Sequence, residues 1–213
     1  MSIFFTADTH FGHVNILHHA NRPFATIKEH DDYLIEQWNN MVHPGDMIYV
    51  LGDFAWRDHA QYRHALHGKV VLIKGSHDRM SQDVLRLFTE VHDGMLIRNF
   101  DKHLICMTHC AMLVWESSHY GAINLYAHSH GRIRETDDRR RMDIGVDVWQ
   151  YRPVPLELIL AIMDKRTFGY KGTGDEANEN VRLLEDRNRN FRASVHVVPP
   201  AEPCPIIPPE QSV

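Results

Sequence analysis

Ile3-Phe4-Phe5-Thr6-Ala7-Asp8-Thr9-His10 is the stretch that decides the fold, because it joins a strand-like run to two polar side chains. Residues 3–7 are short and mostly apolar, which is typical of a buried strand. Asp8 and His10 follow at once, and residues two apart in extended chain point to the same face. The stretch therefore predicts a buried strand with a polar site at its carboxyl end.

Strand and helix signals alternate beyond this first strand. A capping box formed by Thr26 and Glu29 opens a helix with apolar residues at helical spacing. Buried strands are predicted over 47–51 and 69–73, with a helix over 57–67 between them. A strand–helix series with short connections favours a parallel sheet covered by helices.

The second half of the chain is richer in strand signals. Strands are predicted over 103–108, 123–127 and 142–148, and Pro155 opens a short apolar helix over 156–163. Most of the core should therefore lie within one domain.

Composition changes after this domain, which we place at residues 1–165. Residues 166–198 form a polar extension with at most one exposed helix. Six of the ten prolines fall in residues 199–213, which predicts an irregular or disordered tail.

Overall composition excludes several classes of protein. The 213 residues are 43% hydrophobic and 24% charged, as in an ordinary globular chain. No apolar run is long enough to span a membrane, and the first residues do not resemble a signal peptide. Three cysteines without a CxxC motif fit a reducing compartment, so we expect a cytoplasmic protein without a membrane partner. The net charge of −5 argues against a nucleic-acid binder held by charge alone.

Histidine is over-represented, with 17 residues, and several of these residues fall at strand ends together with aspartates. Ligands in open α/β sheets bind beyond the carboxyl ends of the strands. The polar residues that follow the predicted strands are Asp8, His10, Asp53, His77, Asp78, His109, His128 and His130. Carboxylates and imidazoles without thiolates suit Mn, Fe, Zn or Ni and disfavour a structural zinc site. The set is too large for one tetrahedral ion, and two ions sharing an aspartate are suited to phosphoester hydrolysis.

The ordered series Asp-x-His, Gly-Asp, Gly-Ser-His-Asp, His and His-x-His resembles the signature of the calcineurin-like metallophosphoesterase superfamily, from residue 3 to about residue 160. The chain looks like a small bacterial or phage-type member. The resemblance implies an α/β fold, a four-layer αββα sandwich of two mixed β-sheets flanked by helices. It also implies a dinuclear metal site at the carboxyl ends of the strands.

The resemblance also implies a role for each of these residues. One divalent ion, with manganese as the first choice and iron, zinc or nickel as others, would be held by Asp8, His10, Asp53 and His130. A second ion would share Asp53 and be held also by Ser76, His109 and His128. His77 would give a proton to the leaving oxygen, and Asp78 would orient it.

Three positions depart from the family pattern. Ser76 stands where the family has Asn, so a shorter hydroxyl replaces a carbonyl ligand and a weaker second metal site is expected. Ala127 replaces a usual Gly. Arg57 falls where phosphatase-type members have an Arg, although the residues around it differ. Arg57 is therefore a candidate substrate contact, together with His13 and Asn15 on the loop after the first ligands.

These observations predict a metal-dependent hydrolase of phosphodiesters, phosphomonoesters or both, with a small phosphoester as substrate. In-line attack by a hydroxide held between two ions would be followed by proton transfer from His77. Two alternatives remain open: a non-catalytic metal-binding scaffold of the same fold, and a nuclease. The retained ligands weigh against the scaffold, and the negative charge weighs against the nuclease.

Overall fold

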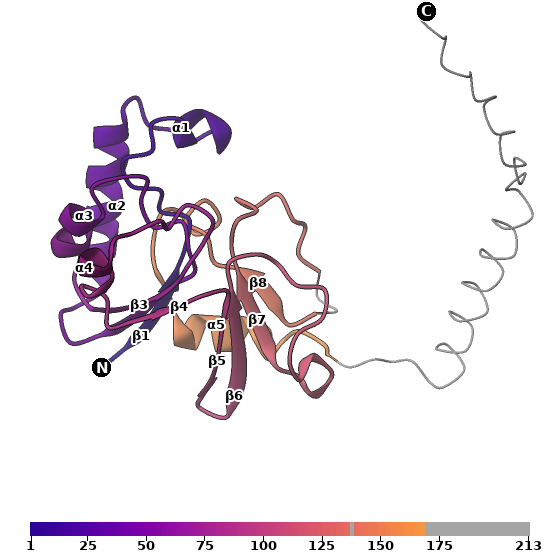
Figure 1. Ribbon diagram of the computed structural model, residues 1–213. Coiled ribbons are helices and arrows are strands. Elements are labelled where there is room, and N and C mark those ends of the chain that lie inside the picture. Colours follow the sequence, from indigo (N-terminus) through magenta and orange to yellow (C-terminus); the bar gives the residue numbers. More distant parts are fainter. Residues whose placement is uncertain (137–138, 169–213) are drawn as a thin grey trace, which may run out of the picture. The chain divides into compact units, whose positions relative to one another are not determined.

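Two mixed β-sheets form the body of the protein in a computed structural model, which describes residues 1–136 and 139–168 (Figure 1). The first sheet has the order β4-β3-β2-β1-β9 and consists of β1 (Ile3–Thr6), β2 (Met47–Val50), β3 (Lys69–Ile73), β4 (Glu90–His92) and β9 (Val154–Pro155). Its first four strands are parallel, and β9 runs antiparallel to β1. The parallel arrangement expected from the alternating strand and helix signals is confirmed.

The second sheet has the order β5-β6-β7-β8 and consists of β5 (Met95–Phe100), β6 (His103–Thr108), β7 (Ile123–Tyr126) and β8 (Arg141–Asp143). Strand β5 is antiparallel to β6, whereas β6, β7 and β8 are parallel. The carboxyl ends of β6 and β7 therefore lie together, as do those of β1, β2 and β3 in the first sheet.

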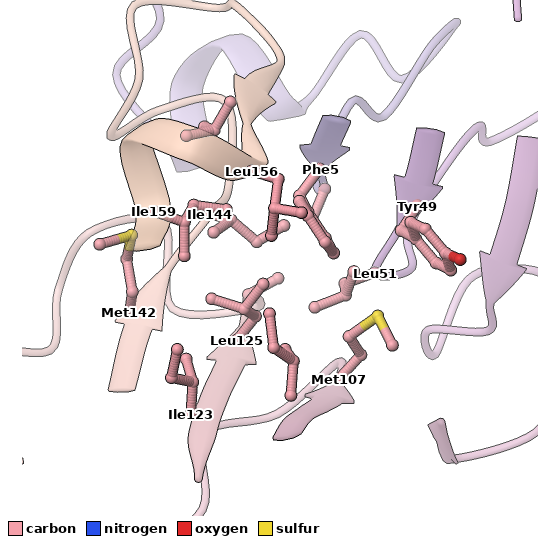
Figure 2. Packing of buried hydrophobic residues seen from close by; sticks show 14 of the residues in the cluster. Phe5, Tyr49, Leu51, Met107, Ile123, Leu125, Met142, Ile144, Leu156 and Ile159 are labelled. Carbon is pink, nitrogen blue, oxygen red and sulfur yellow. The ribbon is translucent and has the colours of Figure 1, made fainter. Parts of the chain in front are cut away.

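Apolar side chains from both sheets fill the space between them. Figure 2 shows Phe5 of the first sheet, and Leu51 directly after β2, packed near Met107 and Leu125 of the second sheet. Alternate residues of the same strands face the other way, so that Phe4, for example, joins a second cluster. Because β1, β2 and β3 are covered on both faces, their sequences are almost continuously apolar.

Helices cover the outer face of the first sheet. The main one, α2 (Ile27–Met41), packs Leu34 and Trp38 against that face, and the Thr26 side chain accepts the amide hydrogen of Glu29 at 3.1 Å. The shorter helices are α1 (Ile16–His19), α3 (His59–Ala65) and α4 (Gln82–Leu85). None of the helices in the described part of the chain is long and apolar enough to cross a membrane.

The second sheet is covered differently. Helix α5 (Leu156–Met163) packs Ile159 and Met163 into the core between the sheets. On the outer face, buried Trp115 packs with Cys106 and donates its indole hydrogen to the carbonyl of Ala122 at 2.9 Å. A short 3-10 helix, Ser118–Tyr120, belongs to the same segment. The predicted fold class, two mixed sheets flanked by helices, is confirmed.

One predicted strand is shorter than expected. The apolar alternation predicted a strand over 142–148, but β8 ends at Asp143. The Asp143 carboxylate accepts the amide hydrogen of Gly145 at 2.8 Å and turns the chain. The Ile144 amide then binds Tyr126 in the second sheet, and the Val146 amide binds Ala7 beside the first. This segment therefore connects the two sheets.

The described residues end shortly after the predicted domain. The domain boundary at residue 165 stays a prediction, as does the division of residues 166–213 into an extension and a tail. The expected helix in the polar extension and the tail at 199–213 lie outside the described residues.

Candidate metal centre

Six of the predicted ligands lie together where strands of both sheets end. They form two groups, in each of which one ligand atom per residue lies within 4.8 Å of the others. The first group is Asp8, His10 and His130, and the second is Asp53, His109 and His128. Each group takes residues from loops that follow strands of both sheets.

Asp53 lies where the two groups meet. Its Oδ2 atom is 3.3 Å from Nε2 of His109 and 3.6 Å from Nε2 of His10. Its Oδ1 atom accepts the amide hydrogen of His77 at 3.0 Å. One carboxylate oxygen is thus directed between imidazoles of both groups, which is the arrangement that a bridging ligand needs.

Two buried ligand atoms show that the donor set fits metal ions. Asp8 Oδ1 and His10 Nε2 are buried and have no hydrogen-bond partner among the described residues. An unsatisfied buried polar atom costs roughly 1–3 kcal/mol, so such atoms call for an explanation. Carboxylate oxygen and imidazole nitrogen are suitable ligands for a divalent cation, which would satisfy both atoms.

The pKa values of several ligand residues are strongly shifted in the metal-free site. Burial raises the pKa of Asp8 to about 7 and lowers the pKa of His10 to about 2. Burial also opposes charge on His109, but the hydrogen bond and charge of Asp53 outweigh it and raise the pKa of His109 to about 9. For Asp53, burial is outweighed by His109, and its pKa lies below the ordinary value. A proton on His109 thus balances the carboxylates.

Partners of the ligands fix the orientation of two imidazoles. Nδ1 of His109 donates to the carbonyl of Leu51 at 2.8 Å, and Nδ1 of His130 donates to Oδ2 of Asp147 at 2.7 Å. Nε2 of each ring is then the nitrogen that remains for a metal. Such outer hydrogen bonds set the tautomer of a ligand and increase its basicity.

Arg22 holds Asp147 in place and was not found by sequence reasoning. Its guanidinium binds both carboxylate oxygens of Asp147 at 2.8 Å and also donates to the carbonyl of Asp8 at 2.7 Å. It further donates to Nε2 of His30 at 2.7 Å, and this buried ring donates in turn to Asp31. Arg22 and Asp147 are 125 residues apart and share no motif, so no sequence signal linked them.

His77, the predicted proton donor, lies beside Asp53. Its side chain is 39% exposed, and its Nε2 is 3.9 Å from Oδ2 of Asp53. Asp78, expected to orient the His77 ring, instead has both oxygens on backbone amides, those of Asp53, Phe54 and Gly75. Asp78 thus shapes the turns that carry Asp53 and His77. Ser76, in the same turn, is exposed, and its ligand role stays a prediction.

The three predicted substrate contacts differ in position. The ring of His13 lies 5.3 Å from that of His10, and it stacks on Trp56 at 4.3 Å. Asn15 is exposed at the start of α1. Arg57 is exposed and lines a cavity of about 340 Å³ beside Tyr62, between α2 and α3. Of the three, His13 is the one that lies against a predicted ligand, His10, in the described part of the chain.

Comparisons with known proteins support the fold but assign no activity. No family model matches the chain. It is 29% identical over 168 residues to the uncharacterized protein MJ1445 of Methanocaldococcus jannaschii, covering 76% of this chain and 92% of that protein. It is 27% identical over 180 residues to the gene 66 protein of Mycobacterium phage D29, covering 70% and 89% of the two chains.

A solved structure, that of the protein of unknown function AQ665 from Aquifex aeolicus, aligns with a TM-score of 0.59 at 21% identity. The alignment covers 76% of this chain and 98% of that one. At this level of identity the likeness shows a shared fold.

Proposed function

We propose that the protein is a metal-dependent phosphoesterase that hydrolyses a small phosphodiester or phosphomonoester. The observation that carries the proposal is the pair of ligand groups that meet at Asp53, with His77 beside them. Its motifs also resemble those of the calcineurin-like metallophosphoesterases, which supports the same reaction class.

The residues present fit two divalent ions. Asp8, His10, Asp53 and His130 would hold one ion, and Asp53, Ser76, His109 and His128 the other. When bound, the ions supply positive charge that stabilises the developing charge on a phosphoryl group. The mixture of oxygen and nitrogen ligands suits manganese, our first choice, and also iron, zinc and nickel.

Residues of the chain would then place the substrate and move one proton. His77, partly exposed beside Asp53, would hold a proton on its imidazole and give it to the leaving oxygen. Asp78 would position His77 by fixing the turn that carries it. His13 would contact the substrate beside the ligands, with Asn15 and Arg57 as further candidate contacts.

Hydrolysis assays test the proposal directly. The chelator-treated protein is reloaded with Mn, Fe, Zn or Ni and incubated with aryl and alkyl phosphomonoesters and phosphodiesters. We expect metal-dependent hydrolysis that Asp53→Asn abolishes. His77→Ala should lower turnover of alkyl esters much more than that of activated aryl esters, because only a poor leaving group needs the proton. Equal losses on both would remove the proton-donor role.

The same assays separate the two alternatives. Metal binding without hydrolysis of any ester would support a non-catalytic scaffold. Cleavage of single- or double-stranded DNA, with little activity on small esters, would support a nuclease.

A further inference from the structure

Trp56 is a large aromatic side chain that the proposed mechanism does not use. It lies three residues after Asp53, and 50% of it is exposed. Its amide donates to the carbonyl of Phe11 at 2.8 Å, and Ala55 pairs with Phe11 in an isolated bridge. The backbone of Trp56 is therefore fixed to the loop that carries His10.

Ring contacts connect Trp56 to the reacting region on two sides. Its ring stacks on that of His13 with centroids 4.3 Å apart and planes 10° from parallel. The His13 ring lies 5.3 Å from that of the ligand His10. Trp56 is also 5.1 Å from the ring of His77, tilted by 52°. One ring, that of His13, thus lies between Trp56 and the predicted ligand His10, and Trp56 is directly next to the proposed proton donor His77.

This placement relates Trp56 to the leaving group of the substrate. A proton donor must lie next to the oxygen that departs, so the leaving group passes His77. The half-exposed indole lies 5.1 Å from the His77 ring, in the region where the remainder of that group would extend. Indole rings favour flat aromatic partners, because offset stacking adds to the burial of apolar surface.

We infer that Trp56, backed by His13, is a stacking site for an aromatic ring on the leaving group, so that the substrates are phosphoesters of nucleosides or other ring-bearing alcohols. The inference rests on the proposed function. Stacking of a base on an aromatic side chain corresponds to roughly a 5- to 150-fold effect on affinity. Discrimination of that size should be lost when the indole is removed.

Matched substrate pairs test the inference. Adenosine 5′-phosphate and ribose 5-phosphate share the ester bond and differ in the base, and benzyl and cyclohexylmethyl phosphate differ in the ring. The corresponding methyl diesters serve if the protein prefers diesters. We expect Trp56→Ala to lower the ratio of kcat/KM between the two members of a pair by about 5- to 150-fold, mainly through KM. Trp56→Phe should retain most of the ratio.

The control is Tyr120→Ala, which removes another exposed aromatic ring, 79% exposed on the 3-10 helix Ser118–Tyr120. It should leave the ratio within twofold of the wild-type value. If Trp56→Ala lowers the kcat/KM ratio in the nucleoside pair alone, the site is specific for a nucleobase. If the ratio falls in both pairs, the site accepts any flat ring. An unchanged ratio in Trp56→Ala would overturn the inference.

A binding measurement separates this inference from the proposed function. Quenching of Trp56 fluorescence by adenosine is taken as the difference between the wild-type protein and Trp56→Phe. If adenosine quenches Trp56 in a protein that hydrolyses no ester, the stacking site is supported and the phosphoesterase proposal fails. If the protein hydrolyses esters, but Trp56→Ala leaves the kcat/KM ratio unchanged and adenosine does not quench Trp56, the phosphoesterase proposal stands and the stacking site is excluded.

Discussion

Asp8 is a candidate metal ligand whose burial destabilises the folded protein when no metal is bound. Its side chain is fully buried, with one oxygen on the amide of His128 and the other without a hydrogen-bond partner among the described residues. Burial raises its pKa to about 7, so a charged Asp8 is unfavourable unless a cation lies beside it. The carboxylate therefore suits metal binding better than it suits the metal-free fold.

We expect Asp8→Asn to stabilise the metal-free protein and to weaken metal binding. The amide can still accept the His128 hydrogen, and the repulsion from Asp53 disappears. Thermal unfolding in chelator should shift upward by roughly 2–6 °C, and manganese should add less stability than in the wild-type protein.

The control for this variant is Asp143→Asn. Asp143 is equally buried, but its carboxylate accepts from Ser129, Gly131 and Gly145. Replacing it should lower the unfolding temperature, because donors would lose their acceptor. A metal-free Asp8→Asn protein that unfolds below the wild-type temperature would contradict the prediction.

Protons should leave the site when ions bind. The pKa of His109 is about 9 and that of Asp8 about 7 in the metal-free site, and a metal ligand must be deprotonated. Both values lie above those of an unfolded chain, so metal-free stability should fall as pH rises through them. Apparent metal affinity should rise by about tenfold per pH unit between 7 and 9 and level off above 9.

Titration calorimetry in buffers of different ionisation enthalpy measures the protons released. At pH 8 we expect close to one proton from His109 for each protein loaded. An affinity that does not change between pH 7 and 9 would be inconsistent with a protonated His109 in the metal-free site.

Ser76 is the predicted ligand position at which the sequence departs from the calcineurin-like pattern that it otherwise resembles. Its hydroxyl is shorter than an asparagine side chain, so we expect Ser76→Asn to lower the manganese concentration for half-maximal activity. Thr9 is buried on another loop of the site, with its hydroxyl on the carbonyl of Phe54. Thr9→Ser keeps that hydroxyl, serves as the control and should not move the midpoint. Tighter binding by the native serine form would exclude the weakened second site.

Loops are the elements that present the ligands, and their backbone conformations are unusual. Five of the six grouped ligands have a left-handed φ, namely Asp8 at 55°, His10 at 49°, Asp53 at 51°, His128 at 67° and His130 at 49°. Asp and His adopt this region more readily than most residues, but it is still uncommon for them. Strain of this kind persists only where the surroundings impose it. Hydrogen bonds between neighbouring loops, such as that from the His10 amide to the Asp53 carbonyl at 2.9 Å, impose it here.

The turn after β8 should control metal affinity through Asp147. We expect Asp147→Asn to lower affinity for manganese by about 10- to 100-fold, because His130 loses the carboxylate that orients its ring. Some stability should also be lost, since Arg22 is left buried with its charge unpaired.

Asp46→Asn is the control for that stability loss. Asp46 is a buried carboxylate that accepts the amides of Ser2 and His43. The variant should lower the unfolding temperature and leave metal affinity unchanged. Equal metal affinity in the Asp147→Asn and wild-type proteins would show that His130 is positioned without Asp147.

Sequence patterns predicted the strands that are buried on both faces and the helices α2, α3 and α5, and missed the partly exposed strands β4 and β5. Strands such as β2 and β3 are continuous apolar runs, and their ends marked the ligands. Strand β5 was not predicted, because most of its residues are exposed or only partly buried. The role of His30 was missed for another reason. Its partner Arg22 is defined by a network that reaches Asp147, and only the folded chain brings these residues together.

At the scale of the whole molecule, the residues of the candidate metal centre come from both sheets. Asp8, His10 and Asp53 follow strands of the first sheet, and His109, His128 and His130 follow strands of the second. Bound ions would therefore oppose separation of the sheets as well as order the loops.

We expect metal binding to slow hydrogen exchange in both sheets together. Ligands that bind only the folded state stabilise it by about 2.7 kcal/mol at 100 times Kd. Amides of β2 and β7, measured by mass spectrometry with manganese and with chelator, should therefore gain protection to a similar extent. Protection confined to one sheet would show that the ions do not join the two.

The pairing of Arg22 with Asp147 has a consequence for synthesis of the protein. A ribosome makes the first ligand, Asp8, long before it makes His130 and the carboxylate that orients that ring. A growing chain that ends just before residue 147 contains the candidate metal ligands but not the carboxylate that orients the His130 ring. The arrangement that orients His130 can therefore form only after residue 147 has been made, and premature termination anywhere before that point yields fragments that lack it.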